Sequence, residues 1–581
     1  MATGATLPVK PETGGKTAEG YSTPKADKLA QRMVVPPKRV LPIIFLPGIM
    51  GSNLRMSAAR QELLKKSNNM AWHPEDKTES MALINASAAV RQKQLDPDTT
   101  EVDIYDPVNN PTGDEGETSD ERHDNVKVDS YYLGIGIDTP LLTNDVKSAK
   151  NSKTKEQKAR ERGWGEIFYT SYRQLLEMCE KHLNAPYIRA GEPSLWWKSA
   201  ILGVPPQNWQ AMAEFKLSPL DEPMLKQAVT GCWFPVHAMG YNWLQSNMDS
   251  GKAIAQRIET LIKHYVEHGY QCEKVIVVTH SMGGLAARAL IHPEMGNLKD
   301  KVLGMVHGVM PATGAGAGYK RMRCGFEGGT VDMPSKVCGN FGREVTAILG
   351  NAPGGLELLP SRAYGNGWLQ IRHQDAILLS LPKNGDPYDE IYKLRDKWYG
   401  LVYNESWLNP AGLRDKSLAR THELLDAAKT FHSAIENTFH EQSYAHYGND
   451  INRRSWHHVL WDISLLAAPT ELGHLRVMQD SQQGKMMLID SANDAILMRR
   501  RPSYDKRPLV YDTITALLRP AAEPGDQTVP FHSADSQYRS GKFKGIFRQT
   551  GYEHQSSYSD QNALRSTLYS IVQIARTMTW R

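Results

Sequence analysis

The sequence predicts an α/β fold with a mostly parallel central sheet, formed by one large domain that carries a large, mainly helical inserted cap. Apolar β-branched runs of strand length favour this fold, and so do the amphipathic helical patterns between them. Continuous apolar runs are typical of parallel strands that helices cover on both faces. The length of 581 residues, 40% of them hydrophobic, suits a large core with insertions.

The expected elements alternate along the first half of the chain. Apolar runs predict three strands, at residues 40–46, 274–279 and 302–307. Apolar positions at helical spacing predict helices at about 168–183, 251–268, 286–290, 415–442 and 564–575. Alternating strands and helices predict a parallel sheet covered on both faces.

Composition divides the chain into parts. Residues 1–37, rich in Lys, Thr, Gly and Pro, predict a flexible tail. Residues 38–310 predict the first part of the core, with a polar insertion at about 86–160. Residues 311–450 change from glycine clusters to long helical patterns and predict the cap. Residues 451–581 return to strand-like runs and predict the second part of the core.

Charge and hydropathy exclude several classes of protein. The net charge of +4 is a mild basic excess, and there is no arginine-rich arm, so we expect no nucleic-acid partner. The N-terminus has no apolar core, so it predicts no signal peptide. No stretch reaches about 18 consecutive apolar residues, so we expect no transmembrane helix.

Five cysteines are scattered along the chain without a CxxC pair. Their spacing therefore predicts no structural zinc site, and we expect neither a metal nor another cofactor. A sparse, odd number fits a protein made in a reducing compartment. Pairing of Cys324 with Cys338 under oxidising conditions stays open as an alternative to free thiols.

Ser281 is the candidate nucleophile. It lies in Thr279-His-Ser-Met-Gly283, where an apolar strand pattern turns directly into a helical one. A nucleophile elbow requires small residues two positions before and after the serine, because the bend crowds the backbone. Thr279 stands where Gly is usual, and Gly283 fits. An ordinary serine N-cap is the alternative, but strand, bend and helix in this order favour a serine hydrolase of the α/β-hydrolase fold.

A nucleophilic serine needs a histidine base and an orienting acid, which follow it in the order acid, then histidine, in this fold. Asp526 is the candidate acid because Gly525-Asp526 forms a turn before a short Thr-Val run. His554 is the candidate base because it follows an apolar segment and precedes the last helix. The alternatives are Asp490, Asp494 and Asp512 for the acid and His532 for the base.

Two backbone N–H groups are the candidates for an oxyanion hole. Met282 follows the nucleophile at the start of a helix, where N–H groups can stabilise negative charge. Ile49 lies in the glycine-rich loop after the first strand, which supplies the second donor in such enzymes. The alternative for this loop is a simple glycine turn.

Seven phrases carry a resemblance to known families. In order, LPGIMGSN, AWHPEDK, THSMGGL, GDQTVP and EHQSSY resemble the lecithin:cholesterol acyltransferase and lysosomal phospholipase A group. MVHGVMPATGAGAGY and NGDPYDEIYKL resemble the third family of type VI secretion lipase effectors, over about residues 40–580. Carried onto this sequence, the triad of the resembling families falls on Ser281, Asp526 and His554, with Ile49 and Met282 as oxyanion donors.

The resemblance also implies a biological role. It implies a phospholipase that acts on bacterial membrane phospholipid, is made in the cytoplasm and is delivered to the periplasm of a rival cell. Its implied partners are a cognate immunity protein and a secretion spike or adaptor protein. An acyltransferase with the same triad is one alternative function, and a catalytically inactive binding or adaptor protein is another.

Overall fold

The computed structural model describes most of the chain. The described residues are 9–12, 15–21, 30–35, 37–104, 135–146, 152–188, 191–328, 332–464, 471–490 and 513–580, with only the backbone for those before 37. Among them, no helix is both long and apolar enough to cross a membrane. All five cysteines are free thiols, so Cys324 and Cys338 do not pair.

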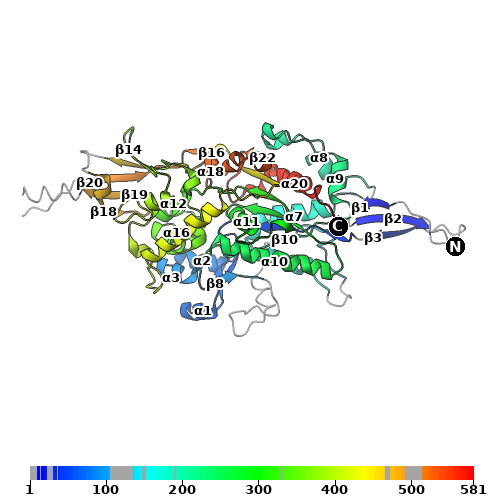
Figure 1. The fold of residues 1–581 in the computed structure, drawn as a ribbon. Coiled ribbons are helices and arrows are strands. Elements are labelled where there is room, and N and C mark those ends of the chain that lie inside the picture. Colours follow the sequence, from blue (N-terminus) through cyan, green and yellow to red (C-terminus); the bar gives the residue numbers. More distant parts are fainter. Residues whose placement is uncertain are drawn as a thin grey trace, which may run out of the picture.

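A six-stranded sheet forms the centre of the molecule (Figure 1). In spatial order its strands are β10 (Val236–Ala238), β5 (Ile43–Leu46), β11 (Val275–His280), β12 (Val302–Gly308), β15 (Ser443–Gly448) and β22 (Phe543–Gln549). All five pairings are parallel, which confirms the predicted fold class.

Alternating side chains of these strands enter two separate cores. Ile44 and Leu46 pack into one core, and Ile43 and Phe45 into the other, as the period of two along a strand requires. The first core contains apolar residues of α10 (Asn247–Glu267) and α11 (Gly283–Ile291). The second contains those of α7 (Tyr169–Asn184) and α20 (Gln561–Ala575). Helices therefore cover both faces of the sheet.

Local signals set the ends of the long helices. In α10, the Ser246 side chain accepts a hydrogen bond from the Met248 N–H, and the helix begins one turn before the predicted start. Its end is close to the prediction, because Gly269 after it has a φ of 82°.

A second six-stranded sheet lies at the end of the molecule away from the N-terminus (Figure 1). Its order is β14 (Ala376–Leu381), β13 (Leu369–His373), β17 (Val459–Ser464), β20 (Thr513–Leu518), β19 (Lys485–Asp490) and β18 (Leu475–Asp480). It takes strands from both sides of the predicted boundary at residue 450, while β15, from the predicted cap, belongs to the central sheet. Strand patterns alone do not say which sheet a strand joins, because pairing is non-local.

Residues 311–450, the predicted cap, contain five α-helices in the described structure. They are α12 (Gly316–Cys324), α13 (Met333–Cys338), α14 (Gly342–Leu349), α15 (Pro353–Leu356) and α16 (Leu418–Ile435). α16 ends before Phe439, which the prediction placed on the same helix and which packs on Phe543 instead. This block leaves the carboxyl end of β12, and the second sheet follows the carboxyl end of β15. Both insertions therefore leave from the edge of the central sheet where Ser281 lies.

Smaller elements complete the fold. Short strands are β4 (Arg39–Val40) with β9 (Cys232–Trp233), the sheet β7 (Met70–Trp72), β6 (Leu54–Met56) and β8 (Thr100–Val102), and β16 (Asp450–Ser455) with β21 (Glu523–Gly525). Further helices are α1 (Ala58–Leu64), α2 (Lys77–Asn85), α3 (Ala88–Gln94), α6 (Lys155–Glu161), α8 (Leu195–Ala200), α9 (Glu222–Val229), α18 (Phe531–Ala534) and α19 (Ser536–Arg539). Within the predicted tail, β1 (Val9–Glu12), β2 (Gly15–Tyr21) and β3 (Ala30–Val35) form an antiparallel sheet.

Candidate active site

Ser281 occupies a strained turn between β11 and α11. Its φ is 51°, in the left-handed region that non-glycine residues rarely adopt. Two backbone hydrogen bonds hold this conformation: Ser281 N–H donates to Gly308 O, and Gly284 N–H donates to Ser281 O, both at 2.9 Å. A strained backbone kept by its surroundings is typical of functional sites.

The turn is tight enough to require glycine at Gly283. A Cβ there would lie 2.5 Å from Leu46 O and 2.6 Å from Pro47 O, so a side chain would separate the elbow from the loop after β5. The departure at Thr279 has a local explanation. Its hydroxyl is 3.0 Å from Nδ1 of His307 on the neighbouring strand β12, so the larger side chain is accommodated within the sheet.

The structure brings Ser281, His554 and Asp526 together in one line. His554 Nε2 is 2.9 Å from Ser281 Oγ, and His554 Nδ1 is 2.8 Å from Asp526 Oδ2. All three residues are buried. A hydroxyl, an imidazole and a carboxylate at these distances can pass the serine proton to the imidazole, which the carboxylate orients and stabilises when charged.

Backbone contacts fix the carboxylate of Asp526 beside His554. Its Oδ1 accepts from Val529 N–H at 2.7 Å and from Thr528 N–H at 3.1 Å. His554 N–H in turn donates to Asp526 O at 2.8 Å. Asp526 follows β21 directly, so the pairing of that strand with β16 sets the position of the turn.

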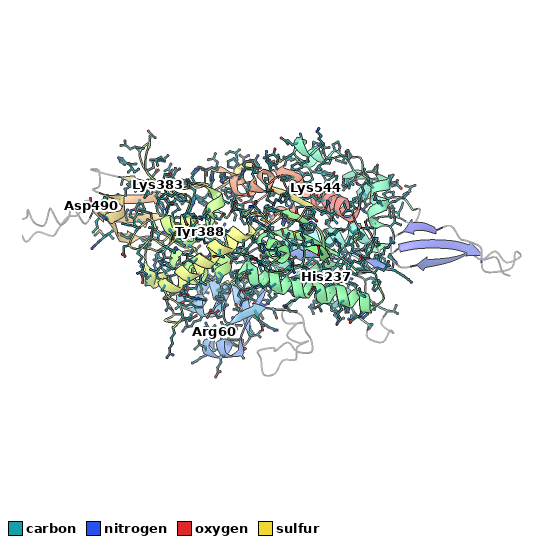
Figure 2. The ribbon with its side chains drawn as sticks, viewed as in Figure 1. Arg60, His237, Lys383, Tyr388, Asp490 and Lys544 are labelled. Atoms are coloured by element: carbon teal, nitrogen blue, oxygen red, sulfur yellow. The ribbon has the colours of Figure 1, made fainter. Side chains whose placement is uncertain are left out.

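The alternative residues lie elsewhere or outside the description. Asp490 is the last residue of β19 in the second sheet, near the tip of the molecule (Figure 2). His532 donates through Nε2 to Tyr364 O at 2.7 Å. Asp494 and Asp512 lie outside the described residues. Of the candidates that the structure describes, Asp526 and His554 are the pair beside Ser281.

The loop of Ile49 lies against the elbow. A Cβ on Gly48 would lie 3.0 Å from Ser281 Cβ, which shows how close the two segments are. Gly51 N–H donates to Gly48 O at 3.0 Å and closes the turn, while Trp72 Nε1 donates to Met50 O at 2.8 Å. Met282 is the N-cap residue of α11. The structure thus places both oxyanion candidates in segments that adjoin Ser281.

Sequence reasoning missed a network formed by His280 and Tyr172. Gly48 N–H donates to Tyr172 Oη at 3.2 Å, and this hydroxyl is 3.2 Å from His280 Nδ1. His280 Nε2 lies 2.9 Å from His554 O, so it donates there and Nδ1 accepts from Tyr172. Burial, followed by the nearby His554, lowers the pKa of His280 well below its usual range, so the ring is neutral. The network connects the loop of Ile49 to the backbone of His554.

Comparison with known proteins places this geometry in a family. No family model and no curated protein matches the chain. Among solved structures, the crystal structure of the Tle4-Tli4 complex matches with 30% sequence identity and a TM-score of 0.70, over 93% of this chain and 99% of that chain. The chain belongs to the type VI secretion lipase effectors.

Membership of these effectors agrees with the predicted α/β-hydrolase fold and with a lipase-like hydrolase. The similarity supports the class of effector that the sequence phrases resemble. It does not support the third family of that class in particular, because the matching structure is Tle4.

Proposed function

We propose that this effector is a phospholipase A that cleaves acyl esters of bacterial membrane phospholipids. The observation that carries the proposal is the line Asp526–His554–Ser281, with distances of 2.8 and 2.9 Å. Membership of the lipase effectors supports an ester of a lipid as the substrate.

The mechanism has two steps through an acyl-enzyme. His554 Nε2 takes the proton of Ser281 Oγ as this oxygen attacks the ester carbonyl, and the N–H groups of Ile49 and Met282 stabilise the oxyanion. Protonated His554 then gives the proton to the leaving lysophospholipid alcohol. Water, deprotonated by His554, releases the fatty acid and restores Ser281. Asp526 keeps His554 in the required tautomer throughout.

Access to this site requires a cover that moves. Ser281 is only 4% exposed, too little for a phospholipid to reach it. We assign the cover to residues 311–450 together with the second sheet, because both leave from the edge of the central sheet next to Ser281. A lipase that draws its substrate from a membrane needs such a cover to present apolar surface when it opens.

The biological role follows from the family. We propose delivery by a secretion spike or adaptor protein from the producing cell into the periplasm of a target, and inhibition by a cognate immunity protein. The Tle4-Tli4 complex supports an immunity partner. The match to Tle4 also supports placing the chain with that protein instead of in the third family.

Product analysis tests the proposed reaction. Wild type and Ser281→Ala are incubated with vesicles of phosphatidylethanolamine, phosphatidylglycerol and cardiolipin, with and without a long-chain alcohol, and the lipids are identified by mass spectrometry. We expect free fatty acid and lysophospholipid from wild type alone. An acyl-alcohol ester as the main product would indicate the acyltransferase. Diacylglycerol or phosphatidic acid, or equal turnover by Ser281→Ala, would refute the proposal.

A further inference from the structure

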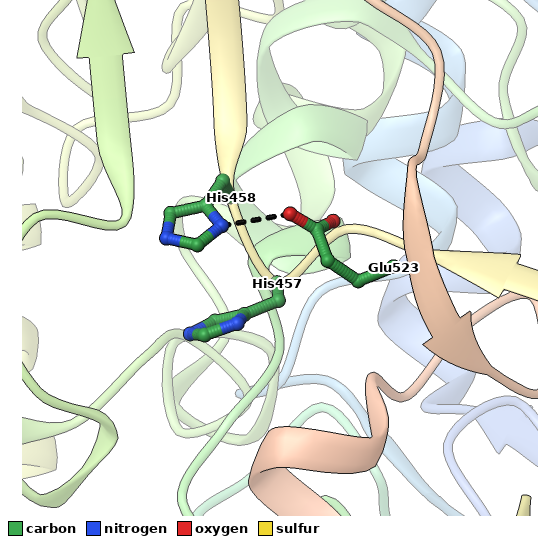
Figure 3. A group of neighbouring side chains, drawn as sticks. All are labelled: His457, His458 and Glu523. Atoms are coloured by element: carbon green, nitrogen blue, oxygen red, sulfur yellow. Dashed lines mark hydrogen bonds and ion pairs between the residues drawn. The ribbon is translucent and has the colours of Figure 1, made fainter. Parts of the chain in front are cut away.

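A second group of side chains outside the active site has the composition of a metal site. His457, His458 and Glu523 each offer one ligand atom, and these three atoms lie within 4.8 Å of one another (Figure 3). In the part of the chain that the structure describes, this is the one group of three or more His, Cys, Asp or Glu side chains that meets this distance.

The backbone brings the three residues together from distant parts of the sequence. His457 and His458 form the link between β16, which ends at Ser455, and β17, which begins at Val459. Glu523 is the first residue of β21 and pairs with Ser455 across the antiparallel ladder. The group therefore lies where the strands that carry Asp526 meet the second sheet.

The side chains are held by contacts within the group and with its neighbours. His458 Nδ1 lies 2.7 Å from Glu523 Oε1, whereas Glu523 Oε2 is buried without a hydrogen bond to any described residue. The ring of His457 stacks on His532, with centroids 3.9 Å apart and planes 10° from parallel. Tyr364 Oη donates to the carbonyl of His457 at 2.9 Å. All three residues are partly exposed, so an ion can enter from solvent.

The pKa shifts of two of the three side chains are compatible with metal binding. Burial, followed by the neighbouring His532 and His458, lowers the pKa of His457 to about 3, so its ring is neutral. Burial raises the pKa of Glu523, but His458 and His457 outweigh it and leave the pKa lowered. Neutral imidazole and ionised carboxylate are the forms that bind metal ions.

We propose that His457, His458 and Glu523 bind a zinc ion, with water as the fourth ligand. Two imidazole nitrogens and one carboxylate oxygen are a common zinc ligand set, with bonds of about 2.0–2.2 Å. Such bonds place ligand atoms about 3.3 Å apart in a tetrahedron, so small side-chain rotations close the site. The ion takes the place of the proton shared by His458 and Glu523. Cysteine spacing predicted no zinc site, and this group contains no cysteine.

The zinc ion would hold two backbone segments next to each other. It ties the β16–β17 link to β21, and Asp526 is only three residues beyond Glu523. We therefore expect zinc to stabilise the fold around the acid without contacting substrate. The proposal does not depend on the proposed phospholipase activity, because zinc binding is measurable in a protein without a nucleophile.

Zinc titration of full-length, tag-free Ser281→Ala protein tests the site. After treatment with a chelator, the protein is titrated with zinc chloride by calorimetry, and its zinc content is measured after dialysis. We expect one zinc ion per chain and a melting temperature that rises by roughly 2 °C or more at saturating zinc. Cobalt(II) should give a visible absorption band of tetrahedral coordination.

Matched variants assign the ligands. His458→Gln and Glu523→Gln should each weaken zinc binding by at least about 10-fold and abolish the cobalt band. His457→Phe removes the third ligand while keeping a ring on His532. The control is His474→Gln, because His474 also pairs with a glutamate, Glu471, at 3.2 Å. Its zinc affinity should equal that of the parent.

Circular dichroism and melting without zinc show whether each variant is folded. The absence of stoichiometric zinc binding by the parent would overturn the proposal. Equal affinity in the parent and in folded His458→Gln and Glu523→Gln would also overturn it, because zinc would then bind elsewhere.

Discussion

Two carboxylate–imidazole pairs take their carboxylates, Glu523 and Asp526, from positions three residues apart on one segment of chain. Asp526 Oδ2 and His554 Nδ1 are 2.8 Å apart, and Glu523 Oε1 and His458 Nδ1 are 2.7 Å apart. Their surroundings differ. The side chains of His554 and Asp526 are 9% and 1% exposed, against 37% and 27% for His458 and Glu523.

A carboxylate–imidazole pair therefore does not by itself determine whether a site is catalytic or binds a metal. Beyond His554 lies the hydroxyl of Ser281, on a strained turn that carries backbone N–H groups. Beside His458 lies a second imidazole, His457, with the ring centroids 4.2 Å apart. The first pair can move a proton, whereas the second offers ligands to a cation.

The largest expected effect is the loss of activity when the Ser281 hydroxyl is removed, because, among the described residues, only the first pair contacts a nucleophile. Ser281→Ala should lower kcat for phospholipid hydrolysis by about 10⁶-fold, because the residue forms the acyl-enzyme. Its melting temperature should stay near that of wild type. His457→Phe, by contrast, should keep kcat within about threefold of wild type when both proteins are measured in zinc-free buffer. Fatty-acid release and labelling by a fluorophosphonate probe measure the two effects, and labelling of folded Ser281→Ala would place the nucleophile elsewhere.

The two carboxylates should differ nearly as much. Asp526→Asn should lower kcat by about 10⁴-fold, because the amide favours the wrong tautomer of His554. Glu523→Gln, measured in zinc-free buffer, should change kcat less than about threefold, since its partner His458 contacts no reacting atom. Initial rates on one phospholipid, with binding of substrate measured separately, make the comparison. Similar losses in both variants would show that the pairs do not have separate roles.

One substitution should break both pairs. Gly525 lies between Glu523 and Asp526, and a Cβ there would clash with the Ser455 side chain and lie 2.5 Å from Val529 O. Gly525→Ala should therefore displace β21, lower kcat by about 10²-fold and weaken zinc binding. Gly551→Ala is a control for backbone change near His554, because no atom lies within 4 Å of its added Cβ, although its φ of 101° adds strain. Loss of activity with unchanged zinc affinity would mean that the two pairs are not mechanically connected.

The smallest expected effect concerns the network behind the elbow. Tyr172→Phe removes the hydroxyl that accepts from Gly48 N–H and contacts His280. One unpaired hydrogen-bond partner costs about 1–3 kcal/mol, so kcat should fall by about 10-fold through displacement of the Ile49 loop. His237, a buried histidine paired with Tyr265 at 2.9 Å, gives the matched control Tyr265→Phe, which should lose stability but not kcat. Equal changes in kcat for both variants would remove the special role of Tyr172.

Much of the site was predictable because its parts carry local signals. Ser281 stands at a change from strand to helix pattern, and Gly283 marks the close approach of backbone that the bend requires. Chain order and turn context point to Asp526 and His554, and the structure brings both to Ser281. His280 stands directly before the nucleophile but carries no such local signal, because its role depends on Tyr172, 108 residues away.

The sequence by itself determined the buried strands β5, β11 and β12, the long helices and the elbow, because their residue patterns and steric limits act over a few neighbouring residues. Only the tertiary structure decided which strands joined the second sheet and which histidines met which carboxylates. The meeting of histidines and carboxylates depends on pairing between β16 and β21, which lie far apart in the chain. That ladder places Glu523 beside His458 and Asp526 beside His554, because backbone pairing of β21 fixes the positions of both carboxylates.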